Sequence, residues 1–529
     1  MHVHEVSRES DGWRWAAKER VFLALSFPMF WAGIFFIGNW VAGVASPLPL
    51  LFFHAAFALS VAAFLLRPRS IFMGALVTLL GLGFWLKFVF HAATGASWVE
   101  PIGSFGETIA EWDQVLLAGG AAMLATVVPT FLTQAPAFAP ADMGTSASYR
   151  RAEPWLWAAF MMGGIALLAV NLPYSFYRVG LDVGLILPFP LNAVLSFLLS
   201  YGLAFGIGCL GYWSWSAGRL SPAALLAIGF VEAALCSAST LSRLRIVLHA
   251  AALVAGWLAC RKHMPISRRA TAGLAALYVA LFVGSIAAVS YDRLVLYAAQ
   301  PEPAAQPADE PVADVASPIP DRQEAGSVSP DTAEPPVQSP ASPDVSAPAA
   351  PSPSRAAEVT VPDAAIMFDQ VARLFIDRWI GLESVMAVVA YQGKGFDLFV
   401  QGVMEHPSVR NDGIYERISR STYRALPGRT FLTMSGGPAI LYYTGSVAIV
   451  FLGMTALCLI GIAIERLCLR LTASPFAAAV VAVAIAYAIV QVNQPYSSFV
   501  LAVELVAASL FTYGLRRAFV MMDRRLCRA

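Results

Sequence analysis

Long uninterrupted apolar runs alternate with short polar stretches along most of the chain. A helix needs about 20 apolar residues to cross the hydrocarbon core of a bilayer, so runs of this length predict membrane-spanning helices. Twelve such runs lie near residues 21–45, 47–66, 70–93, 113–133, 154–173, 185–213, 222–240, 245–260, 271–291, 437–464, 475–492 and 498–515. The pattern therefore predicts an all-α polytopic membrane protein with about 12 transmembrane helices.

The basic residues indicate how these spans are oriented. Short cytoplasmic loops of membrane proteins carry an excess of lysine and arginine. If residues 1–20 are cytoplasmic, the basic residues of the short outer loops are only Arg178, Arg243 and Arg245, and those of the other short loops fall on the inner side. Twelve spans also return the arginine-rich tail 516–529 to the cytoplasm. We therefore expect both termini to be cytoplasmic.

A large external segment is predicted between the transmembrane blocks 21–291 and 437–515. Its first part, 292–362, includes 14 prolines and nine acidic residues within 301–354, a composition that predicts a disordered linker because it offers little apolar area to bury. Its second part, 363–435, begins with apolar residues at helical spacing. We expect an amphipathic helix on the outer membrane surface there, followed by a small polar cap.

Composition and charge exclude several classes of protein. Charged residues make up 13% of the chain and the mean hydropathy is +0.65, whereas a soluble protein has about a quarter of its residues charged. Lys+Arg of 35 against Asp+Glu of 34 leaves no net charge that would attract a nucleic acid. The six cysteines form no CxxC pair or zinc-type spacing, so we expect no disulfide framework and no structural metal.

Ionisable residues inside the predicted spans are candidates for function, because each costs about 2.5–3.5 kcal/mol to insert. They are Lys87, Glu232, His249 and Glu504, with His54 as a further candidate. On the predicted topology the first four lie toward the outer face. We interpret them as one polar crater that opens outward, whereas a transporter needs polar groups near the midplane, within reach of both sides.

The end of the seventh span is rich in hydroxyl groups and runs from Glu232 into Arg243 and Arg245. Exposed amides and hydroxyls beside guanidinium groups favour phosphate binding. Ser242 and the outer-loop residue Arg178 belong to the same predicted site. The alternative is that these residues only anchor the helix at the membrane interface.

A second cluster lies on the predicted amphipathic helix, in the sequence Asp377–Arg378–Trp379 followed by Gly381 and Glu383. Trp379 is suited to stacking on a sugar, Arg378 to binding a phosphate, and Glu383 to acting as a general base. The alternative is an ordinary amphipathic surface helix.

These features together resemble the Wzy-type O-antigen polymerases, which are oligosaccharide repeat unit polymerases among the membrane glycosyltransferases. The resemblance rests on the span layout and the large outer segment. It also rests on Ser237, Ser239, Thr240, Ser242 and Arg243, on Asp377–Trp379 with Gly381 and Glu383, and on residues 87–105 (KFVFHAATGASWVEPIGSF). The Pro-rich insertion departs from the family pattern.

The resemblance implies a GT-C-like fold and a location in the bacterial inner membrane. The implied activity is polymerisation, on the periplasmic face, of repeat units linked to undecaprenyl pyrophosphate. Glu383, Arg243 and Arg378 would be catalytic, and Arg245, Arg178, Trp379, Ser242, Lys87 and Glu232 would bind substrate. Membrane lipid, the lipid-linked glycan and a chain-length regulator protein are the implied partners, with no metal or other cofactor.

Three other functions fit the same span layout. An O-antigen ligase would transfer the glycan to a different acceptor. A flippase or transporter of lipid-linked sugars would need polar residues that reach the cytoplasmic half. An assembly factor of an envelope polysaccharide pathway would need no catalytic residues.

Overall fold

The structure is a computed structural model that describes residues 5–68, 70–133, 142–180, 185, 187–188, 190–298, 381–406, 413–421, 433–491 and 494–526. All of these belong to one compact unit, which comprises residues 1–301 and 371–529. Every regular element among them is a helix.

The helices up to residue 216 are α1 (Glu5–Val41), α2 (Pro47–Leu66), α3 (Ile71–Leu80), the π-helix η1 (Gly81–Leu86), α4 (Lys87–Thr94), α5 (Ile109–Leu124), α6 (Val127–Leu132), the short 3-10 helix η2 (Asp142–Gly144), α7 (Ala147–Tyr174), α8 (Leu191–Phe197), the π-helix η3 (Leu198–Gly202) and α9 (Leu203–Ser216). The later helices are α10 (Pro222–Ser239), α11 (Arg243–Cys260), α12 (Arg268–Ala298), α14 (Leu382–Ala390), α15 (Phe396–Met404), α16 (Ile414–Ser419), α17 (Gly437–Tyr442), α18 (Val447–Thr472), α19 (Pro475–Val490) and α20 (Pro495–Leu526).

Eleven helical stretches among the described residues are long and apolar enough to cross a membrane. They correspond to eleven of the twelve predicted spans. The remaining prediction, 475–492, corresponds to α19, which has 16 residues and is shorter than the others. The prediction of an all-α, multi-pass membrane protein is thus confirmed.

Serine and proline mark the beginnings of several helices. Ser221 and Ser474 each precede a proline at the first helical position, and their hydroxyl oxygens accept hydrogen bonds from the backbone nitrogens of Ala224 and Ala477 at 3.1 and 3.2 Å. A serine at this position satisfies a backbone N–H group that the helix leaves free, and proline has no N–H group to leave free. The sequence therefore sets where α10 and α19 begin.

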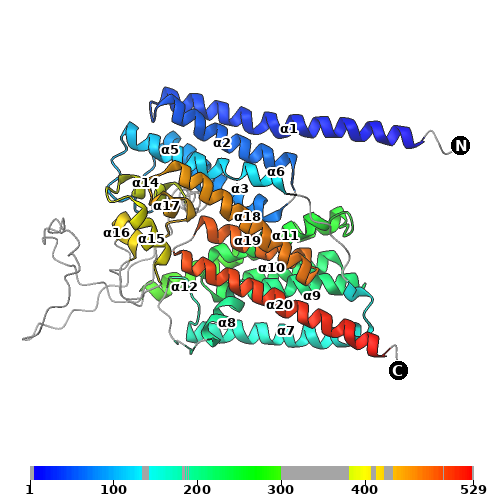
Figure 1. Ribbon diagram of the computed structural model, residues 1–529. Coiled ribbons are helices and arrows are strands. Elements are labelled where there is room, and N and C mark those ends of the chain that lie inside the picture. The colour runs from blue at the N-terminus through cyan, green and yellow to red at the C-terminus, as the bar shows by residue number, and fades with distance from the viewer. Residues whose placement is uncertain are drawn as a thin grey trace, which may run out of the picture. The chain divides into compact units, whose positions relative to one another are not determined.

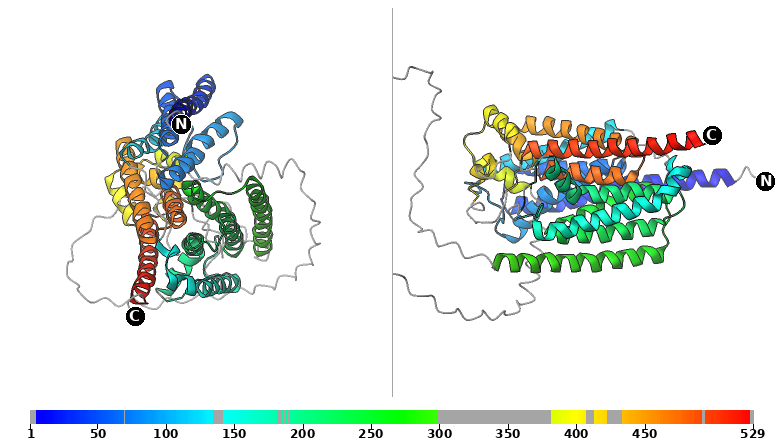
Figure 2. Two further views of the ribbon diagram at one scale, coloured as in Figure 1. Left: turned by 90° about the vertical axis from the view of Figure 1, so that its right-hand side faces the viewer. Right: turned by 90° about the horizontal axis from the view of Figure 1, so that it is seen from below.

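α19 lies at the centre of the bundle, where it packs against α3, α9, α11 and α18 (Figure 2). All but one of its residues are buried, as expected for a helix that is apolar on every side. Glycines allow its neighbours to come close. A Cβ added to Gly208 would lie 2.9 Å from the Ala477 nitrogen, and one added to Gly256 would lie 2.8 Å from the Phe476 Cα.

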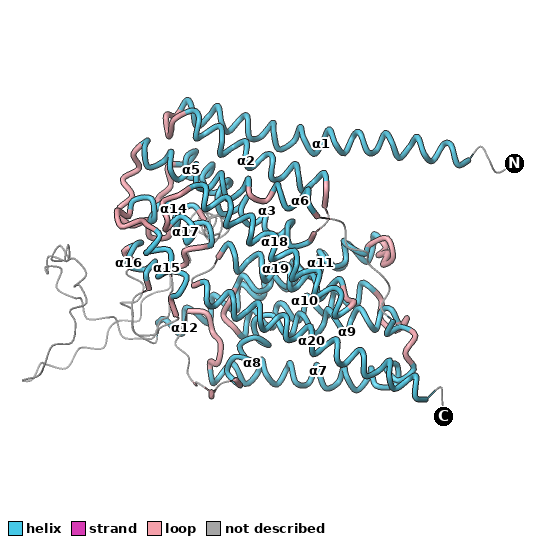
Figure 3. Tube along the Cα trace, viewed as in Figure 1, coloured by secondary structure: helices cyan, strands magenta, loops and turns pink. Residues whose placement is uncertain are grey.

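The bundle has two distinct ends (Figures 1 and 3). α14, α15, α16 and α17 lie together at one end, which we call the cap end. The first turn of α1 and the last turn of α20 both lie at the opposite end. The two terminal helices thus begin and end on the same side of the bundle, and the cytoplasmic location of that side stays a prediction.

The N-terminal end of α11 lies at the cap end. Gly256, in its second half, packs on Phe476 at the start of α19, so the first half of α11 lies beside the last turns of α19. The carbonyls of these last turns approach the start of α17: a Cβ added to Gly436 would lie 2.6 Å from the Val490 oxygen. The turn between α10 and α11, with its arginines, therefore faces the cap end.

The predicted tenth span, 437–464, is wrong in its boundaries. α17 ends at Tyr442 and α18 begins at Val447. Between them Gly445 has φ +73°, a left-handed conformation that glycine adopts readily, and the Ser446 hydroxyl caps α18. The apolar run is thus divided into a short helix of the cap and a span displaced toward the C-terminus.

The predicted amphipathic helix that begins at residue 363 is described only from residue 381. Its described part, α14, is buried along its whole length, so this part does not lie on a membrane surface. The reason is that Val385, Met386, Val388 and Val389 bury one face of this nine-residue helix, while Glu383, Ser384 and the small Ala387 and Ala390 on its other side are buried as well. A helix of this kind is stable only inside a core.

Candidate functional site

A buried ion pair joins Lys87 and Glu383, which are 296 residues apart in the sequence. Lys87 Nζ donates to Glu383 Oε1, and the two side chains are 0% and 1% exposed. Lys87 is the first residue of α4, and Glu383 is the second residue of α14. The structure thus brings together one predicted substrate-binding residue and the predicted general base.

Close backbone packing positions this ion pair. Gly381, which precedes α14, lies against η1: a Cβ added to it would lie 2.5 Å from the Gly83 oxygen. The Ser384 hydroxyl donates to the Gly381 carbonyl at 2.6 Å and fixes the first turn of α14. The residue before α14 is therefore held against η1 by a contact in which no residue bulkier than glycine fits.

One carboxylate oxygen of Glu383 has no hydrogen-bond partner among the residues that the structure describes. No described residue donates a hydrogen bond to its Oε2, although this atom is buried. A buried carboxylate oxygen normally has a donor, so an unfilled position here indicates a place for a ligand group. Nearby, burial raises the pKa of the Tyr415 hydroxyl well above its usual value, with Tyr443 and then Glu383 adding to the effect, so this phenol keeps its proton.

A second cluster, which we call the Arg245 cluster, comprises Glu232, Arg245, His249, Tyr177, Tyr201 and the Ser200 carbonyl. Arg245 and His249 are one helical turn apart on α11 and both reach the Ser200 oxygen, from Arg245 Nη1 at 2.6 Å and from His249 Nε2 at 2.8 Å. On its other side, His249 Nδ1 lies 3.2 Å from both carboxylate oxygens of Glu232 on α10. All three ionisable side chains are buried.

Aromatic residues complete the surroundings of Arg245. Its Nη2 donates to the Tyr177 hydroxyl at 2.9 Å, and its guanidinium carbon lies 4.7 Å from the Tyr201 ring centroid. Both contacts are with neutral groups, and no carboxylate pairs with Arg245 among the described residues. A buried guanidinium without a counterion is unfavourable unless an anion joins it.

A π-helix adjoins each cluster. η1 ends directly before Lys87, and η3 contains Ser200 and Tyr201. A π-helix inserts an extra residue into the turn and changes which backbone groups are free, and such segments are frequent at functional sites. In η3 the backbone carbonyl of Ser200 is free to accept hydrogen bonds from Arg245 and His249 of α11.

The hydroxyl-rich stretch before Arg243 does not form the predicted open phosphate site. The Ser237 hydroxyl donates to the Ser242 carbonyl, the Ser239 hydroxyl to the Leu168 carbonyl, and the Thr240 hydroxyl to the Cys236 carbonyl. These groups are used to build the tight turn between α10 and α11. The turn also holds Leu241 at φ +53°, a left-handed conformation that a side chain with a Cβ adopts rarely.

Asn171 ties this turn to the segment after α7. Its amide nitrogen contacts the Tyr177 and Ser239 carbonyls at 3.2 and 2.9 Å, and its oxygen accepts from the Tyr177 nitrogen at 3.0 Å. Arg178 follows directly, and burial lowers the pKa of its guanidinium while Asp292 opposes that effect. The predicted residues Arg178, Ser242, Arg243 and Arg245 thus lie around one turn.

The predicted single crater is divided into two clusters, and both adjoin the last turns of α19. Tyr487 on α19 interacts electrostatically with Arg245. One turn later, the Val490 carbonyl approaches Gly436, which in turn lies beside Ser384, the residue after Glu383.

Several candidates cannot be placed with these clusters. Arg378 and Trp379 lie outside the described residues. Glu504 is half-buried on α20, and no hydrogen bond or ion pair joins it to either cluster within the described part of the chain. Conversely, Tyr177, Tyr201, Asn171 and the Ser200 carbonyl were not predicted from the sequence. Only the spacing of four residues between Arg245 and His249, which places both on one helix face, could have suggested their partnership.

Ligand-type atoms of Glu232, Cys236 and His249 lie within 4.8 Å of one another, a spacing that a metal ion could use. Each of them already has a hydrogen-bond partner: the Cys236 thiol donates to the Leu199 carbonyl at 2.9 Å, and both imidazole nitrogens of His249 are engaged. The guanidinium of Arg245 would also repel a cation. We therefore interpret the group as a hydrogen-bond network.

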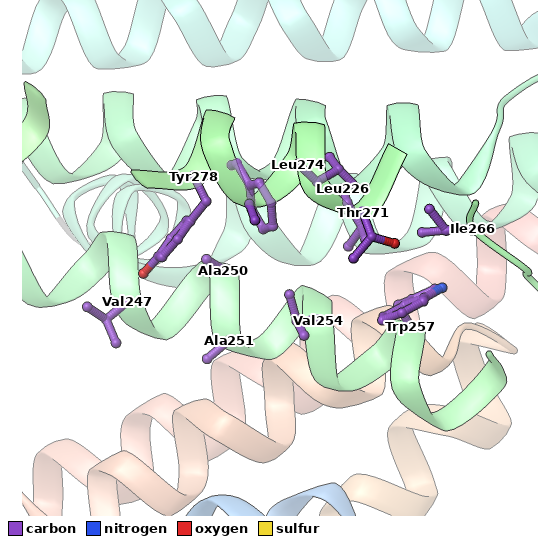
Figure 4. A pocket seen from close by; sticks show the side chains of 12 residues that line it. Leu226, Val247, Ala250, Ala251, Val254, Trp257, Ile266, Thr271, Leu274 and Tyr278 are labelled. Atoms are coloured by element: carbon purple, nitrogen blue, oxygen red, sulfur yellow. The ribbon is translucent and has the colours of Figure 1, made fainter. Parts of the chain in front are cut away.

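An apolar groove of about 360 Å³ lies between α10, α11 and α12 (Figure 4). Its lining includes Phe230, Val254, Trp257 and Tyr278, and a groove with such walls suits hydrocarbon. It faces α12, whereas Arg245 and His249 on α11 face η3. The groove is therefore not an extension of the Arg245 cluster.

Comparisons of the chain with protein-family models, with curated proteins and with solved structures find no match.

Proposed function

We propose that this protein is a membrane glycosyltransferase that polymerises oligosaccharide repeat units linked to undecaprenyl pyrophosphate, with the reaction at the cap end. The observation that carries the proposal is the buried Lys87–Glu383 ion pair, in which Glu383 Oε2 has no donor among the described residues. The layout of spans and the resemblance of short segments to O-antigen polymerases give the substrate class.

Glu383 has the environment that a general base requires. The ammonium of Lys87 compensates the charge of the buried carboxylate, which otherwise would be costly to keep ionised. In the proposed reaction, the acceptor hydroxyl oxygen attacks the anomeric carbon of the growing glycan. The bond from that carbon to the pyrophosphate oxygen breaks, its electron pair stays on the pyrophosphate, and Glu383 Oε2 takes the hydroxyl proton.

The leaving group calls for a cation, and Arg245 is the best placed among the described residues. A guanidinium has five N–H groups. Arg245 uses one on the Ser200 carbonyl and one on the Tyr177 hydroxyl, and the Tyr201 hydroxyl is a further partner, which leaves at most two for a ligand. Phosphate oxygens accept hydrogen bonds from such a planar fork in pairs, so Arg245 is suited to hold one phosphate of the lipid carrier.

The position of the clusters favours an enzyme over a transporter. A transporter binds its substrate near the midplane of the membrane, where either side gains access in turn. Both buried clusters lie at the cap end, beside the last turns of α19 and the start of α17. Further along its length, α19 is buried and apolar.

The Glu383→Gln variant tests the proposal. Glutamine has nearly the shape of glutamate but cannot take a proton at neutral pH. We expect single repeat units to accumulate on the lipid carrier and polymer to fall by about 10²-fold or more, the usual contribution of a general base. The measurement is the glycan profile of a strain whose only copy is the variant, at a protein level matched by immunoblotting.

The matched control is Glu504→Gln, which changes another intramembrane carboxylate outside both clusters, and it should leave polymer length unchanged. Normal polymer length in the Glu383→Gln strain would contradict the proposed reaction. Retention of repeat units on the cytoplasmic face of the membrane, instead of the periplasmic face, would support a flippase in its place.

A further inference from the structure

The hydrogen bonds of His249 require a proton to be shared with Glu232. His249 Nε2 faces the Ser200 carbonyl, which can only accept, so Nε2 must carry a hydrogen. Nδ1 faces the carboxylate oxygens of Glu232. Either Nδ1 also carries a hydrogen and donates it, or the carboxyl group is protonated and donates to Nδ1. In both cases the pair holds one proton more than a neutral imidazole beside a carboxylate.

This proton decides the charge around Arg245. With the proton present, the charges of Glu232, His249 and Arg245 sum to +1, whichever of the first two carries it. Without the proton the sum is zero. Because the three side chains are buried, the difference of one charge acts on a ligand through a medium that screens it less than water does.

The same proton fixes the geometry of Arg245. A neutral His249 has one ring hydrogen, which can reach the Ser200 carbonyl or Glu232 but not both. If it turned to Glu232, the lone pair of Nε2 would face the Ser200 oxygen, and the ring would have to move. Arg245 shares that carbonyl with His249, so its position would change as well.

The other groups around the dyad do not compete for this titration. They are Arg245 on α11, Cys236 on α10, Tyr177 after α7, Tyr201 in η3 and Tyr487 on α19. Phenols, thiols and guanidinium groups ordinarily keep their protons near neutral pH. Arg178, Asp292 and Arg293 are the other charged residues near the turn.

We propose that the Glu232–His249 pair binds a proton together with an anion at Arg245, so that this site takes up a phosphate-type dianion and a proton as a unit. The inference rests on the proposed function in taking Arg245 as the anion site. It adds that anion affinity is greatest when the dyad is protonated and falls as pH rises. By linkage, the bound anion strengthens proton binding to the same extent.

Sulfate is the probe, because its charge is constant over the pH range used. Its binding to the purified full-length protein is measured by calorimetry between about pH 5 and pH 8, the range in which histidine pairs titrate. We expect the dissociation constant to rise about tenfold per pH unit above the titration of the dyad, as uptake of one proton requires.

The variant Glu232→Gln separates the proton from the geometry. Its amide can donate to Nδ1 while His249 still donates to the Ser200 carbonyl, which copies the hydrogen-bond pattern of the protonated pair and removes the carboxyl group that shares its proton. We expect affinity equal to that of the wild-type protein at low pH, now constant with pH. Glu504→Gln should keep the wild-type pH profile. A metal chelator should change neither the affinity for sulfate nor its dependence on pH.

The outcomes are distinct from those of the polymerisation test. If sulfate binding requires Arg245 but does not vary with pH in the wild-type protein, the proton linkage is wrong and the assignment of the anion site still holds. Absence of sulfate binding at every pH would overturn the anion site itself. If pH-linked binding persists while Glu383→Gln polymerises normally, this inference stands and the proposed reaction fails.

Competition by phosphatidic acid in nanodiscs, compared with free inorganic phosphate, identifies a lipid headgroup or a soluble anion as the ligand.

Discussion

The backbone of Gly381 packs directly on the backbone of Gly83, so that the residue before α14 touches the π-helix before α4. An added Cβ at Gly381 would lie 2.5 Å from the Gly83 oxygen and 2.7 Å from its carbonyl carbon. Real Cβ atoms do not approach backbone atoms this closely. This contact therefore sets the separation of the two helices that supply Lys87 and Glu383.

The Gly381→Ala variant should displace α14 from η1 and weaken the ion pair. Because the clash is with backbone, which cannot rotate away, we expect a loss of about 1–3 kcal/mol in the free energy of unfolding, as for overpacked cores, together with reduced polymer. Thermal unfolding in detergent and the glycan profile measure the two effects. Gly395→Ala is the control, since an added Cβ there meets nothing within 4 Å and should change neither quantity.

Single and double replacements at Lys87 and Glu383 should separate stability from activity. Lys87→Met or Glu383→Leu alone removes one half of a buried ion pair, and breaking such a pair costs about 3–5 kcal/mol. The double variant removes both charges, and we expect it to recover most of that stability while polymer formation stays absent. Chemical denaturation of all four proteins gives the coupling energy. Additive losses in the double variant would show that the two side chains are not energetically paired.

Asn171→Ala should destabilise the turn that positions Tyr177 and Arg245. The change leaves the partly buried Tyr177 nitrogen and the buried Ser239 carbonyl without their partner, at up to about 1–3 kcal/mol for each group. We expect a lower unfolding temperature and faster hydrogen exchange in the residues after α7. Asn192→Ala is the matched control, because the buried Asn192 Oδ1 accepts no hydrogen bond among the described residues. Equal effects of the two changes would contradict the assigned role.

Glu465 on α18 caps a helix that lies 394 residues earlier in the chain. Its carboxylate accepts from the Ser70 hydroxyl and from the backbone nitrogens of Ile71 and Phe72, the latter two at 2.9 and 3.3 Å. Glu465→Ala would leave these buried and partly buried donors without this acceptor, and we expect a loss of about 2 kcal/mol or more in unfolding free energy. Glu465→Gln, which retains one acceptor oxygen, should lose less. A loss as large in Glu465→Gln would show that charge, and not hydrogen bonding, stabilises the start of α3.

The spans could be predicted from the sequence because insertion into a bilayer depends on local apolar length. The break between α17 and α18 could not, since Gly445 and Ser446 are ordinary residues within a long apolar run. α14 was misplaced for a related reason. The periodicity of its apolar residues resembles an amphipathic surface helix when residues 363–380 are included, and only packing against α5, α16 and α17 reveals that it is buried.

The chemistry could be predicted residue by residue but not as an arrangement. Lys87, Glu232 and His249 each stand out because a charge within a span is costly, and Glu383 because it follows Arg378 and Trp379 on a predicted amphipathic helix. Which of them pair is a tertiary property. Every residue has a backbone carbonyl, so the sequence does not indicate which carbonyl accepts side-chain donors. The role of the Ser200 carbonyl could therefore not be predicted. Hydroxyl-rich residues before Arg243 were misread because serine and threonine serve equally well in a phosphate site and in a tight turn.

The long interval between Lys87 and Glu383 has a consequence for biogenesis. A ribosome delivers the third span to the membrane well before it translates the cap, so the nascent protein holds a lysine at depth with its carboxylate partner not yet made. Such a lysine is tolerated only by reaching water or headgroups at the membrane surface. Arrival of α14 would then draw Lys87 inward, which makes formation of this buried ion pair one of the last steps in assembly.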